Sequence, residues 1–160
     1  MKYEYPQGRR VNALATYQPF APVPELVVRP FERTLTSDDL IAYLKDLPGA
    51  DAPRVVVLDN AGIHTSKVMK AARPGLAKLG IYLYYLPPYS PELNPAERLF
   101  EEIRRHVEGR VYATLDAKVA DVQAFLEALD ADPPRVRRLC GWDWINAAIA
   151  SLPQPSAIAA

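Results

Sequence analysis

The sequence has little cysteine, no net charge and no long apolar run, and each absence excludes a class of protein. Its single cysteine, Cys140, cannot build an internal disulfide framework, so the reducing cytoplasm is the expected location. No apolar stretch is long enough to span a bilayer and the first residues lack a signal-peptide core, so no membrane partner is expected. The 19 Lys and Arg residues balance the 19 Asp and Glu residues, so any contact with nucleic acid must come from local patches.

The amino-terminal part of the sequence predicts a hairpin followed by a helix. Residues 11–17 and 25–28 are typical of short strands, and a proline-rich connection joins them. Residues 38–47 carry apolar side chains at helical spacing, with Thr36 or Ser37 as the amino-terminal cap.

The middle of the sequence predicts a strand, a helix and a second strand. Residues 55–58 form a continuous apolar run, which indicates a strand buried on both faces of a parallel or mixed sheet. Residues 66–79 have a helical pattern that Pro74 must kink or split, and residues 81–86 form the second strand. A crossover of this kind makes the two strands parallel, and open α/β sheets bind ligands at the carboxyl ends of such strands.

Helices are predicted for the rest of the chain. Residues 95–108 and 115–129 each place apolar side chains on one face. The segment that contains Trp142 and Trp144 is expected to form one or two short helices, with Cys140 as a buried filler.

Two acidic residues stand where this topology would present a ligand. Asp59 directly follows the first strand of the crossover, and Glu97 lies in the first turn of the helix that follows the second strand. Each also has a structural interpretation: Asp59 begins a sequence typical of a turn, and Asn94 and Glu97 have capping-box spacing. Carboxylates that converge at one sheet edge are the ligands that a pair of Mg²⁺ ions needs for phosphoryl transfer.

Two segments around these acids resemble the hallmark blocks of one family. They are Val-Leu-Asp59-Asn60-Ala-Gly-Ile-His64 and Leu86-Pro-Pro-Tyr-Ser-Pro-Glu-Leu-Asn94-Pro-Ala-Glu97-Arg-Leu-Phe. Both look like the blocks of DDE transposases of the Tc/mariner superfamily, in its bacterial insertion-sequence branch. The resemblance assigns the second and third metal-binding acids to Asp59 and Glu97.

The same resemblance implies a fold, a cofactor and a partner. The fold would be α/β and ribonuclease-H-like, with a mixed sheet flanked by helices. Residues 1–130 would form part of the catalytic domain, and residues 131–160 a short helical tail packed on it. The cofactor would be Mg²⁺ or Mn²⁺, with two metal ions only in the complete domain. The partners would be the DNA of transposon ends and targets.

The departure from the family pattern concerns the first catalytic acid. In the family this Asp lies on a strand upstream of the segment that resembles residues 8–14, and Glu4, the acid nearest that place, does not fit the motif. Asp38 and Asp39 are better explained as helix-entry residues. We therefore expect the first strand to be lacking and the chain to be inactive or incomplete. It would be a relic, or half of a split transposase whose upstream half supplies the Asp, and self-association is a further candidate interaction.

Other residues near the two blocks are candidate site neighbours or DNA contacts: Asn60, His64, Tyr89, Ser90, Asn94 and Arg98. His64 could equally be structural, and the prolines around Tyr89 and Ser90 could simply form a turn. Arg98, Arg104 and Arg105 alternate with glutamates, which is typical of a solvated helix face. A purely basic cluster is a candidate DNA patch because clustered cations neutralise phosphates: Arg135, Arg137 and Arg138.

Three functions remain open from the sequence. The first is a transposase catalytic-domain fragment whose intact parent cleaves transposon ends and joins them to target DNA. The second is a non-catalytic relic that binds DNA or associates with an intact transposase. The third is a different ribonuclease-H-like nuclease that recruits an unrecognised acid.

Overall fold

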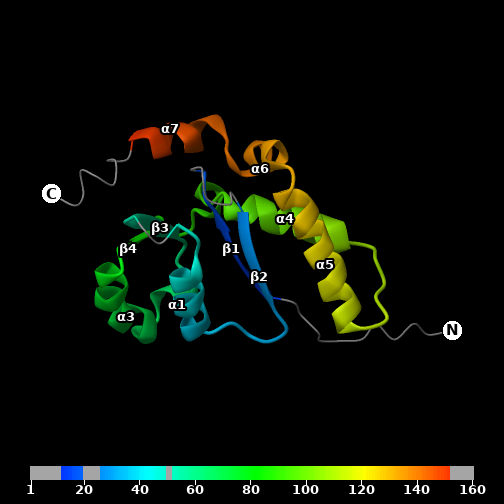
Figure 1. Ribbon diagram of the computed structural model, residues 1–160, viewed down its shortest axis with the longest axis horizontal. Helices are drawn as coiled ribbons and strands as arrows, with labels where there is room; N and C mark the ends of the chain where they lie inside the picture. The colour runs from blue at the N-terminus through cyan, green and yellow to red at the C-terminus, as the bar shows by residue number, and fades with distance from the viewer. Residues whose placement is uncertain (1–11, 20–25, 50–51, 152–160) are drawn as a thin grey trace.

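The computed structural model describes residues 12–19, 26–49 and 52–151. Its four strands and the helices next to them occupy one half of the molecule, and helices α4 and α5 occupy the other, with α6 and α7 along one side (Figure 1). In the described part of the chain, no helix is long and apolar enough to cross a membrane.

The first two strands form the predicted hairpin. β1 (Asn12–Tyr17) pairs antiparallel with β2 (Leu26–Phe31), in a register that sets Asn12 opposite Phe31 and Tyr17 opposite Leu26. β2 runs three residues further than the sequence pattern indicated and contains Pro30. A proline is tolerated there because β2 pairs with β1 alone among the described strands, which makes it an edge strand.

Helix α1 (Ser37–Asp46) begins where the cap signals predicted. The Thr36 hydroxyl accepts a hydrogen bond from the Asp39 backbone amide, and the Asp39 carboxylate accepts one from the Thr36 amide, which completes a capping box. The helix buries Leu40, Tyr43 and Leu44, which form the centre of one hydrophobic core.

The two strands of the predicted crossover unit are present. β3 (Arg54–Leu58) and β4 (Ile81–Tyr85) are parallel and in register from end to end. Between them lie a one-turn helix, α2 (Gly62–Thr65), which the sequence pattern did not indicate, and α3 (Lys67–Lys78). Pro74 lies inside α3 and does not split it.

The prediction that residues 55–58 are buried on both faces is wrong. Val56 and Leu58 are buried beneath α1 and α3, but Val55 and Val57 on the other face are 45% and 46% exposed. Tyr82 and Tyr84 of β4 are exposed as well. A continuous apolar run places apolar side chains on both faces of a strand. The described helices cover only one of these two faces.

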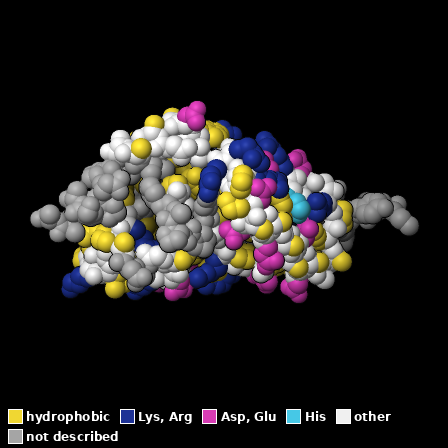
Figure 2. Space-filling model, turned by 45° about the horizontal axis from the view of Figure 1, so that its top comes forward, with side chains coloured by type: hydrophobic (Ala, Val, Ile, Leu, Met, Phe, Trp, Pro, Cys, Tyr) yellow, Lys and Arg dark blue, Asp and Glu magenta, His cyan; other side chains and the backbone are white. Residues whose placement is uncertain are grey.

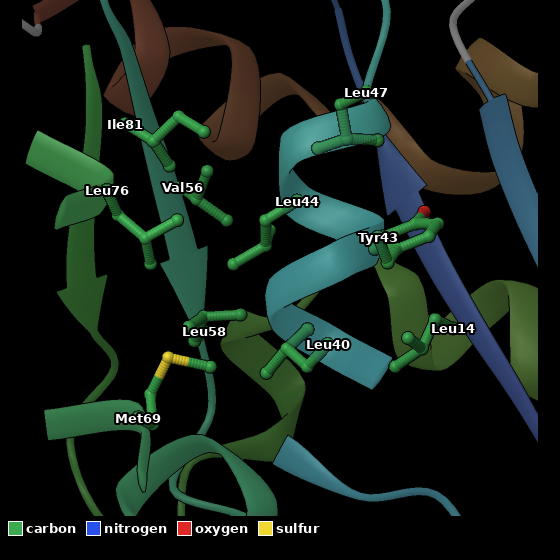
Figure 3. Close-up of a cluster of buried hydrophobic side chains, with 10 residues drawn as sticks. All are labelled: Leu14, Leu40, Tyr43, Leu44, Leu47, Val56, Leu58, Met69, Leu76 and Ile81. Carbon is green, nitrogen blue, oxygen red and sulfur yellow. The ribbon is translucent and has the colours of Figure 1, made fainter. Parts of the chain in front are cut away.

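The four strands form two separate two-stranded sheets and not one mixed sheet. Figures 1 and 3 agree on their order across the molecule, which is β4, β3, β1, β2, with α1 packed over the interval between β3 and β1. One core joins both sheets, because Leu14 of β1 belongs to the same cluster as Val56 and Leu58 of β3 (Figure 3). Among the described strands, β1 and β3 therefore each keep one edge without a partner strand.

A second core lies on the other face of the hairpin. It gathers Leu26 of β2 with side chains from three helices: α4 (Ala96–Val107), α5 (Leu115–Asp130) and α6 (Pro133–Cys140). Cys140 is buried in it, as predicted. A final helix, α7 (Asp143–Ser151), follows, so the expectation of one or two short helices after residue 130 is confirmed.

Candidate active site

Asp59 directly follows β3, at the carboxyl end of the parallel pair. Its Oδ1 accepts a hydrogen bond from the Ala61 backbone amide at 3.0 Å, so the turn interpretation of this segment is correct for one carboxylate oxygen. The side chain is 35% exposed. Toward the described residues, Oδ2 makes no hydrogen bond, which leaves this oxygen available to a ligand.

His64 is the residue that the structure brings closest to Asp59. It lies in α2, and its Nδ1 atom is 2.6 Å from Asp59 Oδ1 and 3.1 Å from the Asp59 backbone oxygen. The imidazole is only 14% exposed. The sequence showed that the two residues are near each other along the chain, but the one-turn helix that aims the ring at the carboxylate left no periodic signal.

Asn60 joins the ends of the two parallel strands. Its side-chain amide donates to the Leu86 backbone oxygen at 2.7 Å, and the Leu86 amide donates to the Leu58 oxygen at 2.8 Å. These bonds fix the segment that leads out of β4 beside the segment that carries Asp59. Asn60 thus has a structural function next to Asp59, and its interpretation as a site neighbour or DNA contact stays a prediction.

The loop after β4 presents an aromatic side chain to solvent. Tyr89 is fully exposed, and its φ of 58° is uncommon for a residue other than glycine. Ser90 donates a hydrogen bond to the Pro88 oxygen, and a single 3₁₀ turn, η1 (Pro91–Leu93), completes the loop.

Glu97 lies in the first turn of α4 as predicted, but it does not close a capping box. The Asn94 side chain accepts from the Ala96 amide, whereas the Asn94 amide donates to the Pro91 oxygen and not to Glu97. The nearest charge is the guanidinium of Arg104, with 3.8 Å between Nη2 and Oε2. With 34% of its side chain exposed, Glu97 keeps a carboxylate that the helix end does not use.

Asp59 and Glu97 offer oxygen donors, which are the type of ligand that a hard divalent cation prefers. Both offer partly exposed carboxylate oxygens, and Mg²⁺ is commonly held by one or two protein carboxylates together with water and substrate phosphates. Within residues 12–19, 26–49 and 52–151, no three His, Cys, Asp or Glu side chains gather to hold a metal. The two acids thus have the right donor type, but no group of three metal ligands is present among the described residues.

Arg98 is held on two sides. It donates to the Glu101 carboxylate at 2.9 Å, and its guanidinium lies 4.3 Å from the centre of the Trp142 ring. Arg105 pairs with Glu102 in the same way, so the interpretation of this helix face as ion-paired is confirmed. The sequence gave no signal that Trp142, more than forty residues downstream, would cover Arg98.

The basic cluster of α6 is not isolated from acidic groups. Helix α6 packs on α4, and Glu102 lines an open surface pocket of about 210 Å³ together with Arg135, Arg138 and Leu139. The guanidinium of Arg135 also lies over the Phe125 ring, 5.7 Å from its centre. On the face of the molecule that Figure 2 shows, basic and acidic side chains are mixed. The cluster is purely basic along the sequence, and packing brings the carboxylate to it.

Comparison with known proteins identifies the family. A family model described as "DDE superfamily endonuclease" matches residues 2–117, which include both Asp59 and Glu97. The chain belongs to this family. Membership carries a transposase-type function, DNA as the substrate class and a typical use of divalent metal ions. The mixed helices and small sheets described above are consistent with such a nuclease fold.

The chain is also similar to a curated protein whose name states no function. It is the "Uncharacterized protein y4pE/y4sA" of Sinorhizobium fredii (strain NBRC 101917 / NGR234), which is 27% identical over 121 residues. The alignment covers 75% of this chain and 85% of the relative.

Proposed function

We propose that this chain supplies the second and third acids of a DDE transposase catalytic domain of the Tc/mariner type. The observation that carries the proposal is the state of Asp59, which directly follows β3: one carboxylate oxygen accepts from the Ala61 amide and lies 2.6 Å from His64 Nδ1, and the other has no partner among the described residues. Glu97, on the helix after β4, is the other acid.

The chemistry proposed is cleavage of DNA strands at transposon ends and their joining to target DNA. A bound Mg²⁺ or Mn²⁺ pair would activate the attacking oxygen and stabilise the leaving oxygen of an in-line displacement. Asp59 and Glu97 would hold the ions through their exposed oxygens. Tyr89 and Ser90, in the loop between β4 and α4, are proposed DNA contacts, and Asn94 orients the start of the Glu97 helix through the Ala96 amide.

The proposed complete fold is ribonuclease-H-like, and its missing part is a strand between β1 and β3. This is supported by the edges of β1 and β3 that lack a partner among the described strands, and by the single core in which α1 packs on both sheets. A strand added there would pair with both edges and join four strands into one sheet of five. It would also bring the first acid of the set beside Asp59, from a segment elsewhere in a longer chain or on a separate polypeptide such as the upstream half of a split transposase.

The first experiment measures Mn²⁺ binding by paramagnetic broadening of NMR signals from the 160-residue protein. We expect signals near Asp59 and Glu97 to broaden first, and Asp59→Ala and Glu97→Ala each to reduce the effect. Glu101→Ala is the matched control, because it removes an acid one turn along the same helix. Broadening centred elsewhere, or unchanged in the Asp59 variant, would contradict the proposed site.

The second experiment tests incompleteness. We expect the 160-residue protein to show little cleavage of transposon-end DNA, because the described residues do not bring three metal ligands together. Co-expression with the polypeptide encoded directly upstream should restore cleavage and protect backbone amides of β1 and β3 from hydrogen exchange. Robust cleavage by the chain alone would refute incompleteness, and protection confined to β2 and β4 would refute the position of the added strand.

A non-catalytic function is the second candidate, and the absence of a third ligand among the described residues favours it. In that case the chain is a relic that binds DNA, or an intact transposase, through the arginines of α4 and α6. DNA binding would then weaken steeply with salt and would be indifferent to Asp59→Ala. Arg138→Ala, at the pocket beside Glu102, would weaken it.

A further inference from the structure

We propose that His64 is a positioning residue for Asp59, and that Oδ2 of Asp59 is the atom presented to a divalent cation. The proposal rests on the proposed function and assigns a task to a residue that this function leaves unused. It starts from the pairing of the His64 ring with one particular carboxylate oxygen, Oδ1, at 2.6 Å.

The position of the ring hydrogen follows from the hydrogen bond that Nδ1 makes to the main chain. The Asp59 backbone oxygen lies 3.1 Å from Nδ1 and can only accept a hydrogen bond, so Nδ1 of His64 must carry the hydrogen atom. The same nitrogen lies 2.6 Å from Asp59 Oδ1, so the ring contacts both the main chain and the side chain of Asp59.

The backbone of His64 is held in place from two directions. The His64 backbone amide donates to the Ala61 oxygen at 2.9 Å, within the turn that begins α2. The His64 backbone oxygen accepts from the Tyr85 hydroxyl at 2.8 Å, and Tyr85 is the last residue of β4. The turn after β3 and the end of β4 thus fix the backbone that carries the ring, and most of the imidazole is buried.

The Ala61 amide and the His64 ring therefore both contact the same carboxylate oxygen. Oδ1 accepts a hydrogen bond from the Ala61 amide and lies 2.6 Å from His64 Nδ1, whereas Oδ2 has no hydrogen bond to the described residues. A carboxylate whose rotation is fixed in advance loses less conformational freedom when it binds a cation. Hydrogen-bond partners of metal ligands typically contribute about 10-fold to 100-fold in metal affinity.

A merely structural histidine would have a different signature. Its removal would lower the melting temperature without changing the Mn²⁺ affinity of the molecules that remain folded. If His64 positions Asp59, its removal should lower the Mn²⁺ affinity more than it lowers the melting temperature. In that case only a residue with a hydrogen-bond donor at the Nδ1 position can replace it. Asn places an amide nitrogen close to that position, whereas Gln places it one bond further out.

The test is Mn²⁺ binding to the 160-residue protein, followed by water-proton relaxation, with melting temperatures recorded in parallel. We expect His64→Leu to weaken Mn²⁺ binding by about 10-fold or more, and His64→Asn to stay within about threefold of the wild-type protein. His64→Gln should resemble His64→Leu. Wild-type affinity in a folded His64→Leu protein would overturn the proposal. Should His64→Leu not fold, equal affinities of the Asn and Gln variants would overturn it.

Asp59→Ala separates this proposal from the proposed function. If Asp59→Ala abolishes Mn²⁺ binding and His64→Leu does not, the metal site stands and the task assigned to His64 is refuted. If Asp59→Ala binds Mn²⁺ like the wild-type protein, the proposed function fails and this inference fails with it. Nitrogen NMR of the metal-free protein gives an independent check, because a His64 ring protonated only on Nε2 would exclude the bond to Asp59.

Discussion

The hydroxyl group of Tyr43 donates a hydrogen bond to the backbone oxygen of Val27, with 2.8 Å between the two oxygen atoms. It also lies 2.8 Å from Thr16 Oγ1, so one side chain of α1 contacts both strands of the hairpin. Tyr43 is one of the largest buried side chains of the first core. This contact fixes α1 over the hairpin, while the other side of the helix packs on β3.

Tyr43→Phe should therefore lower the stability of the protein. Removal of the hydroxyl leaves a buried acceptor unsatisfied, which costs about 1 to 2 kcal/mol of unfolding free energy. Urea denaturation would measure the change. Tyr84→Phe is the matched control, since that side chain is 63% exposed, and it should leave the midpoint unchanged. Equal midpoints for wild-type and Tyr43→Phe proteins would contradict the assigned contact.

Alkaline pH should destabilise the fold through the same residue. Burial raises the pKa of Tyr43 to about 12, so the folded protein retains this proton where the unfolded chain, with a pKa near 10, releases it. Stability from this group is complete below pH 10 and declines above it. We expect a loss of about 1 kcal/mol between pH 10 and 11 in the wild-type protein relative to Tyr43→Phe. Parallel pH profiles of the two proteins would refute the assignment.

The two faces of β3 predict unequal effects of the same substitution. Val56→Ala removes a buried side chain and should cost about 1.5 to 3 kcal/mol. Val57→Ala changes a half-exposed neighbour and should cost less than about 1 kcal/mol. Chemical denaturation of the two variants gives the comparison directly. A loss at Val57 as large as that at Val56 would mean that the exposed face is covered in solution.

The amino-terminal end of α1 should be sensitive to acid. Hydrogen bonds from Arg33 and from Thr36 hold the pKa of Asp39 well below its usual range. A carboxyl group of this kind contributes stability above pH 4, and the contribution is lost as the pH falls. Asp39→Asn should lower the melting temperature at pH 7, and the difference from the wild-type protein should narrow below pH 4. Asp38→Asn, on the same helix turn, should show no such narrowing.

Local signals in the sequence were sufficient for most of the elements. Thr36 and Asp39 have capping-box chemistry that any helix start can use, and the pattern of residues 55–58 and 81–86 predicted the parallel pair. These signals depend on neighbours along the chain, so the local structures that they predict are also present in the folded protein. The effect of Pro74 on its helix could not be predicted in this way. A local rule gives the energetic cost of a proline inside a helix, but it does not give the packing that offsets this cost.

Features that depend on distant neighbours could not be predicted. Whether Val57 is covered depends on which elements lie over β3, and the carboxylate of Glu102 reaches the arginines of α6 only through helix packing. The position of Asp59 followed from the strand that precedes it. The fixed rotation of its carboxylate did not, because it needs Ala61, the one-turn helix and Tyr85 of another strand.

The exposed aromatic of the site loop leads to the last prediction. Tyr89 adopts a positive φ that disfavours any side chain, and the side chain gains no burial in return. Backbone strain of this kind, at an exposed residue beside a candidate site, is reasonable where the side chain meets a ligand. Bases of DNA stack on exposed aromatic rings, and each such stack contributes about 1 to 3 kcal/mol.

Tyr89→Gly should consequently separate stability from DNA binding. Glycine adopts the positive φ without strain, so we expect no loss of melting temperature. Loss of the ring should weaken binding to a fluorescent transposon-end duplex with single-stranded ends by about 5-fold to 150-fold. Tyr89→Phe keeps the stacking surface and should bind like the wild-type protein. Wild-type affinity in Tyr89→Gly would assign the residue to the turn alone, and weak binding by Tyr89→Phe would assign the contact to its hydroxyl group instead of its ring.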